Sequence, residues 1–145
     1  MMDKFFSNRL FDVLRKRILL VSDFICYVIK TKRVYEPPSP EDGCRVLVDR
    51  LWPRGLGKNR AAVDVWLKEV APSGSLRKWF GHKPERWEEF KRRFFMELSR
   101  QPDGVRKLLE LEEKHGTVSL LYSAKDTVHN NATALKEYIE QMKKG

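Results

Sequence analysis

Two short apolar runs, each followed at once by polar and charged residues, constrain the fold of this chain most strongly. The first run is Val46–Val48, inside a strand expected over 44–51, and the second is Val118–Tyr122. Short runs of this kind are typical of strands that are buried on both faces of a parallel sheet. The second run leads through a loop over 123–127 into a helical pattern over 128–143, which is half of a βα unit. The pattern therefore predicts a single layered α/β domain with a mainly parallel sheet flanked by helices.

Other segments complete the expected order of elements. Residues 25–35 are rich in β-branched and aromatic side chains, and they are expected to form a strand that ends at the Pro- and Gly-containing stretch 36–43. Helices are expected over 73–80, 84–99 and 104–114, because each segment has helical spacing and its own start or stop residues.

The apolar patterns also predict which residues face the core. Residues 61–70 fit both a strand, by alternation, and a helix, by i, i+3, i+4, i+7 spacing, so their structure stays open. The core face expected for the helix over 84–99 consists of Trp87, Phe90, Phe94 and Leu98. The residues expected to point inward from the last helix are Val128, Leu135, Tyr138 or Ile139, and Met142.

The composition supports one folded core. Of the 145 residues, 41% are hydrophobic and 34% are charged, which suits one domain and excludes a disordered chain. Two cysteines exclude a disulfide scaffold, and the lack of an internal repeat excludes a solenoid. Scarce glutamine with abundant Lys, Arg and Glu is typical of thermophilic sources.

The first 25 residues are expected to be a helical N-terminal extension to a domain over 26–145. Residues 1–35 contain eight Lys and Arg against three Asp, so more than half of the net charge of +9 lies there. The apolar run 18–29 resembles a signal peptide, but Asp23 interrupts it and no small-x-small cleavage site follows. We therefore expect a cytoplasmic protein without a membrane span.

The polar clusters after the two apolar runs contain the candidate functional residues. The carboxyl ends of parallel strands meet at one edge of a sheet, so 49–55 and 122–130 are expected to lie together there. Arg50, Arg54 and Lys125, beside a helix N-terminus, suit an anion such as a phosphate or a carboxylate. The other candidate ligand contacts are Trp52, Tyr122 and Ser123. The candidate acids and bases are Asp49, Asp126 and His129.

Several of these residues also have a purely structural interpretation. Asp49 and Arg50 face opposite ways on a strand, and each would then pair with a different structural partner. Asp126 would cap the last helix, and Trp52 would belong to the core.

A catalytic trio of Ser123, His129 and Asp126 is a further hypothesis. Serine, histidine and aspartate can act as nucleophile, base and orienting group, but no nucleophile-elbow motif surrounds Ser123. The sequence therefore leaves open whether the site is catalytic.

The sequence indicates no metal site and no phosphate loop. The three histidines are far apart in the chain, at His82, His115 and His129. CxxC and HExxH motifs are absent, and the Gly-Leu-Gly-Lys segment 55–58 lacks the Walker spacing. No cofactor follows from the residues. Cys26 and Cys44, on two expected strands, are predicted to be buried core thiols that approach each other if those strands pair.

Four segments resemble the YeaO-like family of small prokaryotic proteins, which carry a domain of unknown function. The longest are RVLVDRLWPRG at 45–55 and LLYSAKD at 120–126, with shorter matches at 32–35 and 71–77. The resemblance covers about residues 30–142 and implies a compact cytoplasmic α/β domain, without a settled activity, substrate or cofactor.

The chain departs from relatives in the wider superfamily at two points. Those relatives carry cysteine where Tyr122 stands and a Cys-His pair where His129-Asn130 stands, so thiol chemistry is not expected here. Residues 1–25 have no counterpart in the family pattern, and they are either a real extension or an early start of the reading frame, with the true start near 28–30.

Three classes of function are compatible with these features. The first is binding of an anionic small molecule at the strand ends, with or without catalysis. The second is nucleic-acid binding through the basic N-terminus, Lys58, Arg60 and the Arg92-Arg93 pair. The third is a homodimeric interaction module that uses the N-terminal helix and a Trp-rich surface.

Overall fold

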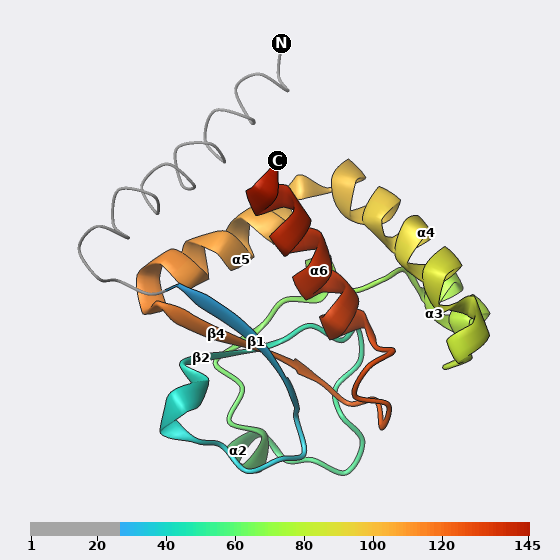
Figure 1. Ribbon diagram of the computed structural model, residues 1–145. Helices are drawn as coiled ribbons and strands as arrows, with labels where there is room; N and C mark the ends of the chain where they lie inside the picture. Colours follow the sequence, from blue (N-terminus) through green and yellow to red (C-terminus); the bar gives the residue numbers. More distant parts are fainter. Residues whose placement is uncertain (1–26) are drawn as a thin grey trace.

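Four parallel strands form the sheet of the described region. The structure, a computed structural model, describes residues 27–145, so the predictions for the N-terminal extension and for Cys26 lie outside the described residues. The strands are β1 (Val28–Arg33), β2 (Cys44–Leu47), β3 (Val65–Trp66) and β4 (Thr117–Tyr122). Their order across the sheet is β1-β4-β2-β3, which puts β4 between β1 and β2 (Figure 1).

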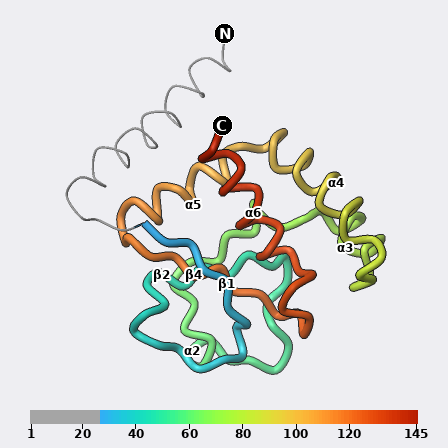
Figure 2. The backbone as a smooth tube through the Cα atoms, viewed as in Figure 1, coloured from blue at the N-terminus to red at the C-terminus, as the bar shows by residue number. Residues whose placement is uncertain are grey.

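Helices cover the two faces of this sheet unequally. The α-helices are α2 (Lys58–Ala61), α3 (Gly74–Phe80), α4 (Trp87–Arg100), α5 (Pro102–His115) and α6 (Asn131–Lys144). Three short 3₁₀ helices join them: η1 (Pro40–Asp42), η2 (Lys68–Val70) and η3 (Pro84–Arg86). Helices α4, α5 and α6 lie on one side of the sheet and α2 on the other (Figure 1 and Figure 2). The prediction of a single α/β domain with a parallel sheet is confirmed.

The core fills both faces of the central strands. The larger cluster packs Val46, Val118 and Leu120 against helices α3 to α6, and its largest side chains include Phe90 and Phe94. A smaller cluster on the opposite face consists of Val34, Leu47, Ala61 and Leu121, with Trp52, Leu56, Val63 and Trp66 packed against it. The two apolar runs are therefore buried on both faces, as their composition predicts.

Two predicted boundaries before α4 differ from the structure. Strand β2 ends at Leu47, although Val48 still donates its N–H to the Leu121 carbonyl, because Asp49 turns away to bond the end of β4. Residues 61–70 are neither a helix nor a full strand: they contain the two-residue strand β3 and then η2.

Two helix starts also differ from the predictions. Helix α5 begins at Pro102 rather than after it, because proline at the first helical position loses no hydrogen bond. Helix α6 begins at Asn131, where the Asn130 side chain accepts from the Thr133 N–H. Val128 therefore precedes the helix and is 58% exposed, so the prediction that it faces inward is wrong.

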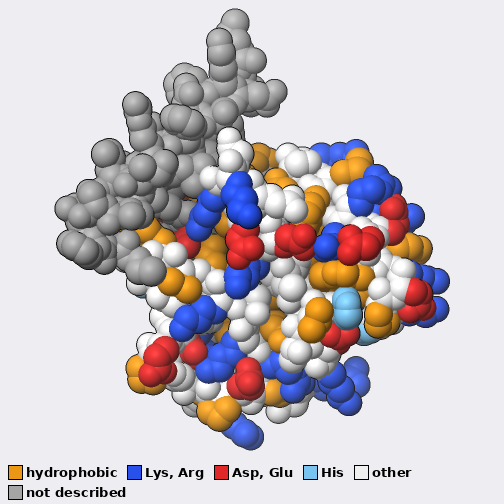
Figure 3. All heavy atoms as spheres, viewed as in Figure 1, with side chains coloured by type: hydrophobic (Ala, Val, Ile, Leu, Met, Phe, Trp, Pro, Cys, Tyr) orange, Lys and Arg blue, Asp and Glu red, His pale blue; other side chains and the backbone are white. Residues whose placement is uncertain are grey.

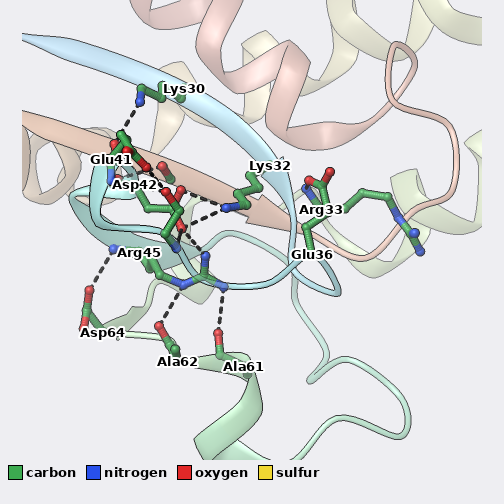
Figure 4. A network of polar contacts seen from close by, with 12 residues as sticks. Lys30, Lys32, Arg33, Glu36, Glu41, Asp42, Arg45, Ala61, Ala62 and Asp64 are labelled. Atoms are coloured by element: carbon green, nitrogen blue, oxygen red, sulfur yellow. Dashed lines mark hydrogen bonds and ion pairs between the residues drawn. The ribbon is translucent and has the colours of Figure 1, made fainter.

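A buried ion-pair network connects β1, η1 and β2 (Figure 4). Asp42 accepts from Lys32 Nζ at 2.9 Å and from Arg45 Nη1 at 2.6 Å. Burial opposes ionisation of Asp42, but the hydrogen bonds from Lys32, from the Ser39 N–H and from Arg45 hold its pKa below the usual value. This network, with the bond from the Ser119 hydroxyl to the Asp42 carbonyl, anchors η1 to β1, β4 and β2.

None of the helices in residues 27–145 is long and apolar enough to cross a membrane.

Candidate functional site

A cavity of about 760 Å³ opens at the carboxyl ends of the strands. Its walls come from the segment after β2, from the loop between β4 and α6, and from α3 and α4. The loops that follow β2 and β4 run side by side beneath the start of α6 (Figure 2). Lys and Arg side chains are spread over the visible face of the molecule, interspersed with Asp and Glu (Figure 3). The side chains predicted at the site and found in the lining are Asp49, Arg50, Trp52, Arg54, Ser123, Lys125 and Asp126.

Asp49 joins the two strand-end loops. Its Oδ2 accepts from the Ser123 N–H at 2.9 Å and from the Ser123 hydroxyl at 2.7 Å. The Asp49 carbonyl also accepts from Trp66 Nε1 at 2.8 Å, which fixes the segment from the other side. One carboxylate oxygen of Asp49 therefore connects the two loops of the cavity wall.

Asp126 and His129 form a pair within the β4–α6 loop. Asp126 accepts from the backbone N–H groups of His129 and Val128, and its Oδ2 lies 2.9 Å from His129 Nδ1. The two backbone bonds and the imidazole contact lower the pKa of Asp126 to about 2. The helix cap predicted for Asp126 belongs to Asn130, and Asp126 instead closes the turn before α6.

The structure does not bring Ser123 and His129 together as nucleophile and base. The Ser123 hydroxyl bonds Asp49, whereas the His129 ring packs edge-on against Trp87, with centroids 5.3 Å apart. A hydrogen bond between Ser123 and His129 is absent from the described residues. Consequently, the geometry needed for proton transfer from Ser123 is missing.

Four cations line the cavity among the described residues: Arg50, Arg54, Arg77 and Lys125. Arg50 Nε donates to the Pro72 carbonyl at 3.2 Å, and the Arg54 carbonyl accepts from the Tyr35 hydroxyl at 2.8 Å. Within residues 27–145, none of these four cations forms an ion pair with a carboxylate. Asp49 and Arg50 therefore have separate partners, and the four cations outnumber the two carboxylates of the lining, Asp49 and Asp126.

Two predicted site residues lie away from the cavity lining. Tyr122 is 3% exposed and belongs to the core, where burial raises the pKa of its phenol. His129 contacts Trp87 behind the β4–α6 loop and is not among the lining residues. Trp52 lines the cavity and also packs edge-on against Trp66, with ring centroids 5.4 Å apart, and its role as a ligand contact stays a prediction.

Several cavity residues were not predicted from the sequence. They are Tyr35, Leu51, Pro53, Pro72, Arg77, Phe80, His82, Phe90, Asn130 and Asn131. Four of them belong to α3, α4 and the first residue of α6, elements that the strand-end rule does not cover. Leu51, Pro53 and Asn130 lie within the predicted strand-end segments but were not singled out. The sequence does contain one signal for the part of the cavity that α3 contributes. Ser73 caps the helix over 74–80, and a helix that begins so soon after β3 must fold back toward the sheet.

The described residues contain no group of three His, Cys, Asp or Glu side chains arranged to hold a metal ion. Cys44 is a buried free thiol in the core, and burial raises its pKa. Its expected role as a core thiol is confirmed.

Residues 28–144 match a protein family described as the inactive DUF488-N3 subclade. The chain is 40% identical over 114 residues to the Escherichia coli protein named "Uncharacterized protein YeaO", which covers 79% of this chain and 98% of that protein. It is also 51% identical over 70 residues to uncharacterized proteins of Mycobacterium bovis and Mycobacterium tuberculosis, which covers 48% of this chain and 59% of theirs. No solved structure matches the chain.

Proposed function

Because the chain belongs to the inactive DUF488-N3 subclade of YeaO-like proteins, we propose that it binds an anionic small molecule in the cavity and does not convert it. The ligand class is a phosphate- or carboxylate-bearing molecule. Arg50, Arg54 and Lys125 hold its anionic group at the carboxyl ends of β2 and β4.

One observation carries this proposal: among the described residues the four cavity cations form no ion pair with a carboxylate, and they outnumber the two carboxylates of the lining, Asp49 and Asp126. Asp49 accepts from Ser123, and Asp126 accepts from the N–H groups of His129 and Val128, so neither carboxylate forms an ion pair with an arginine of the cavity. The four cations of the lining therefore leave an excess of positive charge over these two carboxylates. Arginines in excess beside a concave apolar wall favour a planar, bidentate acceptor such as phosphate or carboxylate.

Binding without conversion agrees with the state of the candidate acids and bases. The carboxylate of Asp126 has a pKa of about 2, far from the range of an acid–base catalyst at neutral pH. Asp49 Oδ2 accepts from Ser123, and the Ser123 hydroxyl has no hydrogen bond to a base other than Asp49 among the described residues. The description of the family as inactive also supports binding without conversion.

The nucleic-acid and homodimer alternatives have weaker support. Arg92 and Arg93 both bond Glu89, so part of the proposed phosphate-binding surface is already neutralised. The four tryptophans lie in the described region and are partly buried, which leaves little of the Trp-rich surface that a dimer would use.

The test is a thermal-shift titration of the full chain with inorganic phosphate and pyrophosphate. Arg54→Gln is expected to raise the half-maximal concentration roughly ten- to a hundredfold, since a hydrogen bond to a charged group contributes about 1.5–3 kcal/mol. The Tm without ligand should stay unchanged, because only the backbone carbonyl of Arg54 has a described hydrogen bond.

Arg60→Gln is the matched control. It removes the same charge from an exposed residue of α2 that does not line the cavity, and it should titrate like the unchanged protein. Equal effects of both substitutions would indicate that phosphate binds a diffuse basic surface rather than the cavity. If only short oligonucleotides, and neither phosphate nor pyrophosphate, stabilised the protein at 50 mM salt, the nucleic-acid alternative would be favoured.

A further inference from the structure

A second polar wall faces the cavity from α3, and it was not part of the predicted site. Arg77 lies in the last turn of α3, and His82 follows the Gly81 cap of that helix. Both side chains line the cavity and both residues are exposed. This wall therefore offers a guanidinium and an imidazole to anything that enters from the strand-end side.

The other cations of the cavity, Arg50, Arg54 and Lys125, come from different segments of the chain, the ones that follow β2 and β4, and they form a first wall. Tyr35 donates its hydroxyl to the Arg54 carbonyl at 2.8 Å, and the Arg33 guanidinium lies 5.1 Å from the centre of the Tyr35 ring. Arg33 Nε in turn donates to the Ala124 carbonyl at 2.9 Å, next to Lys125. These contacts connect the backbone at Arg54 with the backbone next to Lys125. The segments that follow β1, β2 and β4 therefore form one continuous rim of the cavity.

Arg50 links the first wall to the segment that leads into α3. Its Nε donates to the carbonyl of Pro72, which lies two residues before α3 begins. The aromatic pair Phe80 and Phe90, stacked with centroids 4.4 Å apart, also lines the cavity from the α3 and α4 side. The cavity that holds both groups of cations therefore also has an apolar wall.

The backbone holds His82 in a conformation that few residues adopt. His82 has φ 57°, directly after Gly81 at φ 54°, and the turn is closed by a hydrogen bond from the Lys83 N–H to the Phe80 carbonyl at 3.0 Å. Glycine or asparagine would fit such a turn with less strain than histidine. Strained residues of this kind concentrate at ligand sites.

We infer that the ligand carries two acidic groups separated by an apolar or ring-shaped middle. This inference rests on the proposed function. Arg50, Arg54 and Lys125 hold the more highly charged group, and Arg77 with His82 holds a second, singly charged group such as a carboxylate. A cavity of about 760 Å³ accommodates a molecule of this size.

The experiment is calorimetric titration of the full chain with two series of probes. One series is alkylphosphonates, and the other is phosphonoalkanoic acids of the same chain lengths, which differ by a terminal carboxylate. At the best chain length the carboxylate is expected to strengthen binding at least tenfold. Arg77→Gln should remove that gain while leaving alkylphosphonate binding unchanged, and His82→Gly should reduce it without lowering Tm, since glycine suits the left-handed backbone.

Lys78→Gln is the matched control, because it removes one charge from the same helix at a residue outside the cavity lining. It should retain the full gain. If alkylphosphonates bind in an Arg54-dependent way and the carboxylate adds nothing at any length, the inference about two acidic groups is overturned and the proposed function stands. If neither series binds, the proposed function itself fails.

Discussion

Replacing Arg45 with Met is expected to lower the free energy of unfolding by about 3–5 kcal/mol, the usual cost of removing one partner from a buried ion pair. Arg45 is 4% exposed, and its guanidinium donates to Asp42, to the Ala61 carbonyl at 2.8 Å and to the Ala62 carbonyl at 3.0 Å (Figure 4). Methionine would fill much of the space but would leave both carbonyls and part of Asp42 without a donor.

The same guanidinium also stabilises an unfavourable backbone conformation. Ala62 ends α2 in the left-handed region, with φ 48°, where a side chain costs about 1–2 kcal/mol. The bond from Arg45 to the Ala62 carbonyl helps to hold this residue, so its loss should also loosen α2.

Urea unfolding monitored by tryptophan fluorescence measures the effect of Arg45→Met. Arg45→Lys should give an intermediate loss, because a lysine keeps the charge near Asp42 but cannot reach both carbonyls with a planar fork. Arg92→Met, at a residue whose side chain is 62% exposed beside Glu89, should change the free energy of unfolding much less. Equal losses for Arg45→Met and Arg92→Met would show that the buried network contributes little.

Replacing Gly43 with Ala is expected to lower the free energy of unfolding by about 3 kcal/mol or more, through backbone strain together with a steric clash. Gly43 joins η1 to β2 with φ 64° and ψ −136°, a region that is open almost only to glycine. A Cβ at this position would lie 2.3 Å from the Thr117 carbonyl oxygen at the start of β4. Since that atom belongs to the backbone of the central strand, the strand itself would have to shift.

The control for Gly43→Ala is Gly74→Ala. Gly74 is the first residue of α3, and a Cβ there meets no atom within 4 Å, so alanine should be neutral or slightly stabilising. Thermal unfolding should therefore separate the two variants by on the order of 10 °C. Equal unfolding temperatures for Gly43→Ala and Gly74→Ala would contradict the close approach of Gly43 to Thr117 at the start of β4.

The parallel sheet could be predicted because two apolar runs were too short for helices and were apolar on both faces. The ends of these elements were less predictable. Asp49 and Asp126 both follow strands, but the structure gives them different roles. Asp49 bonds Ser123, which is 74 residues distant in the chain. Asp126 closes a turn before Asn130, the residue that caps α6. A single sequence does not reveal such partners.

The candidate site was predictable in part for the same reason. The rule that parallel strands present their carboxyl ends at one edge brought Arg50, Arg54 and Lys125 to one cavity. The rule says nothing about which helix covers that edge, and so Arg77 and His82 on the α3 wall were missed. Tyr122 follows strand alternation and points into the core with Val118 and Leu120, which the string LLYSAKD alone does not indicate.

The most direct test of the proposed site is a titration of the isotope-labelled full chain with inorganic phosphate, followed by ¹H–¹⁵N NMR spectra. Binding in the cavity predicts saturable shifts of the backbone amides in 49–54 and 123–131, together with the side-chain Nε–H signals of Arg50 and Arg54. It also predicts that Arg54→Gln weakens these shifts while Arg60→Gln does not. Saturable shifts confined to the basic residues of α2 and α4, or no saturable shift at all, would contradict an anion site at the carboxyl ends of the strands.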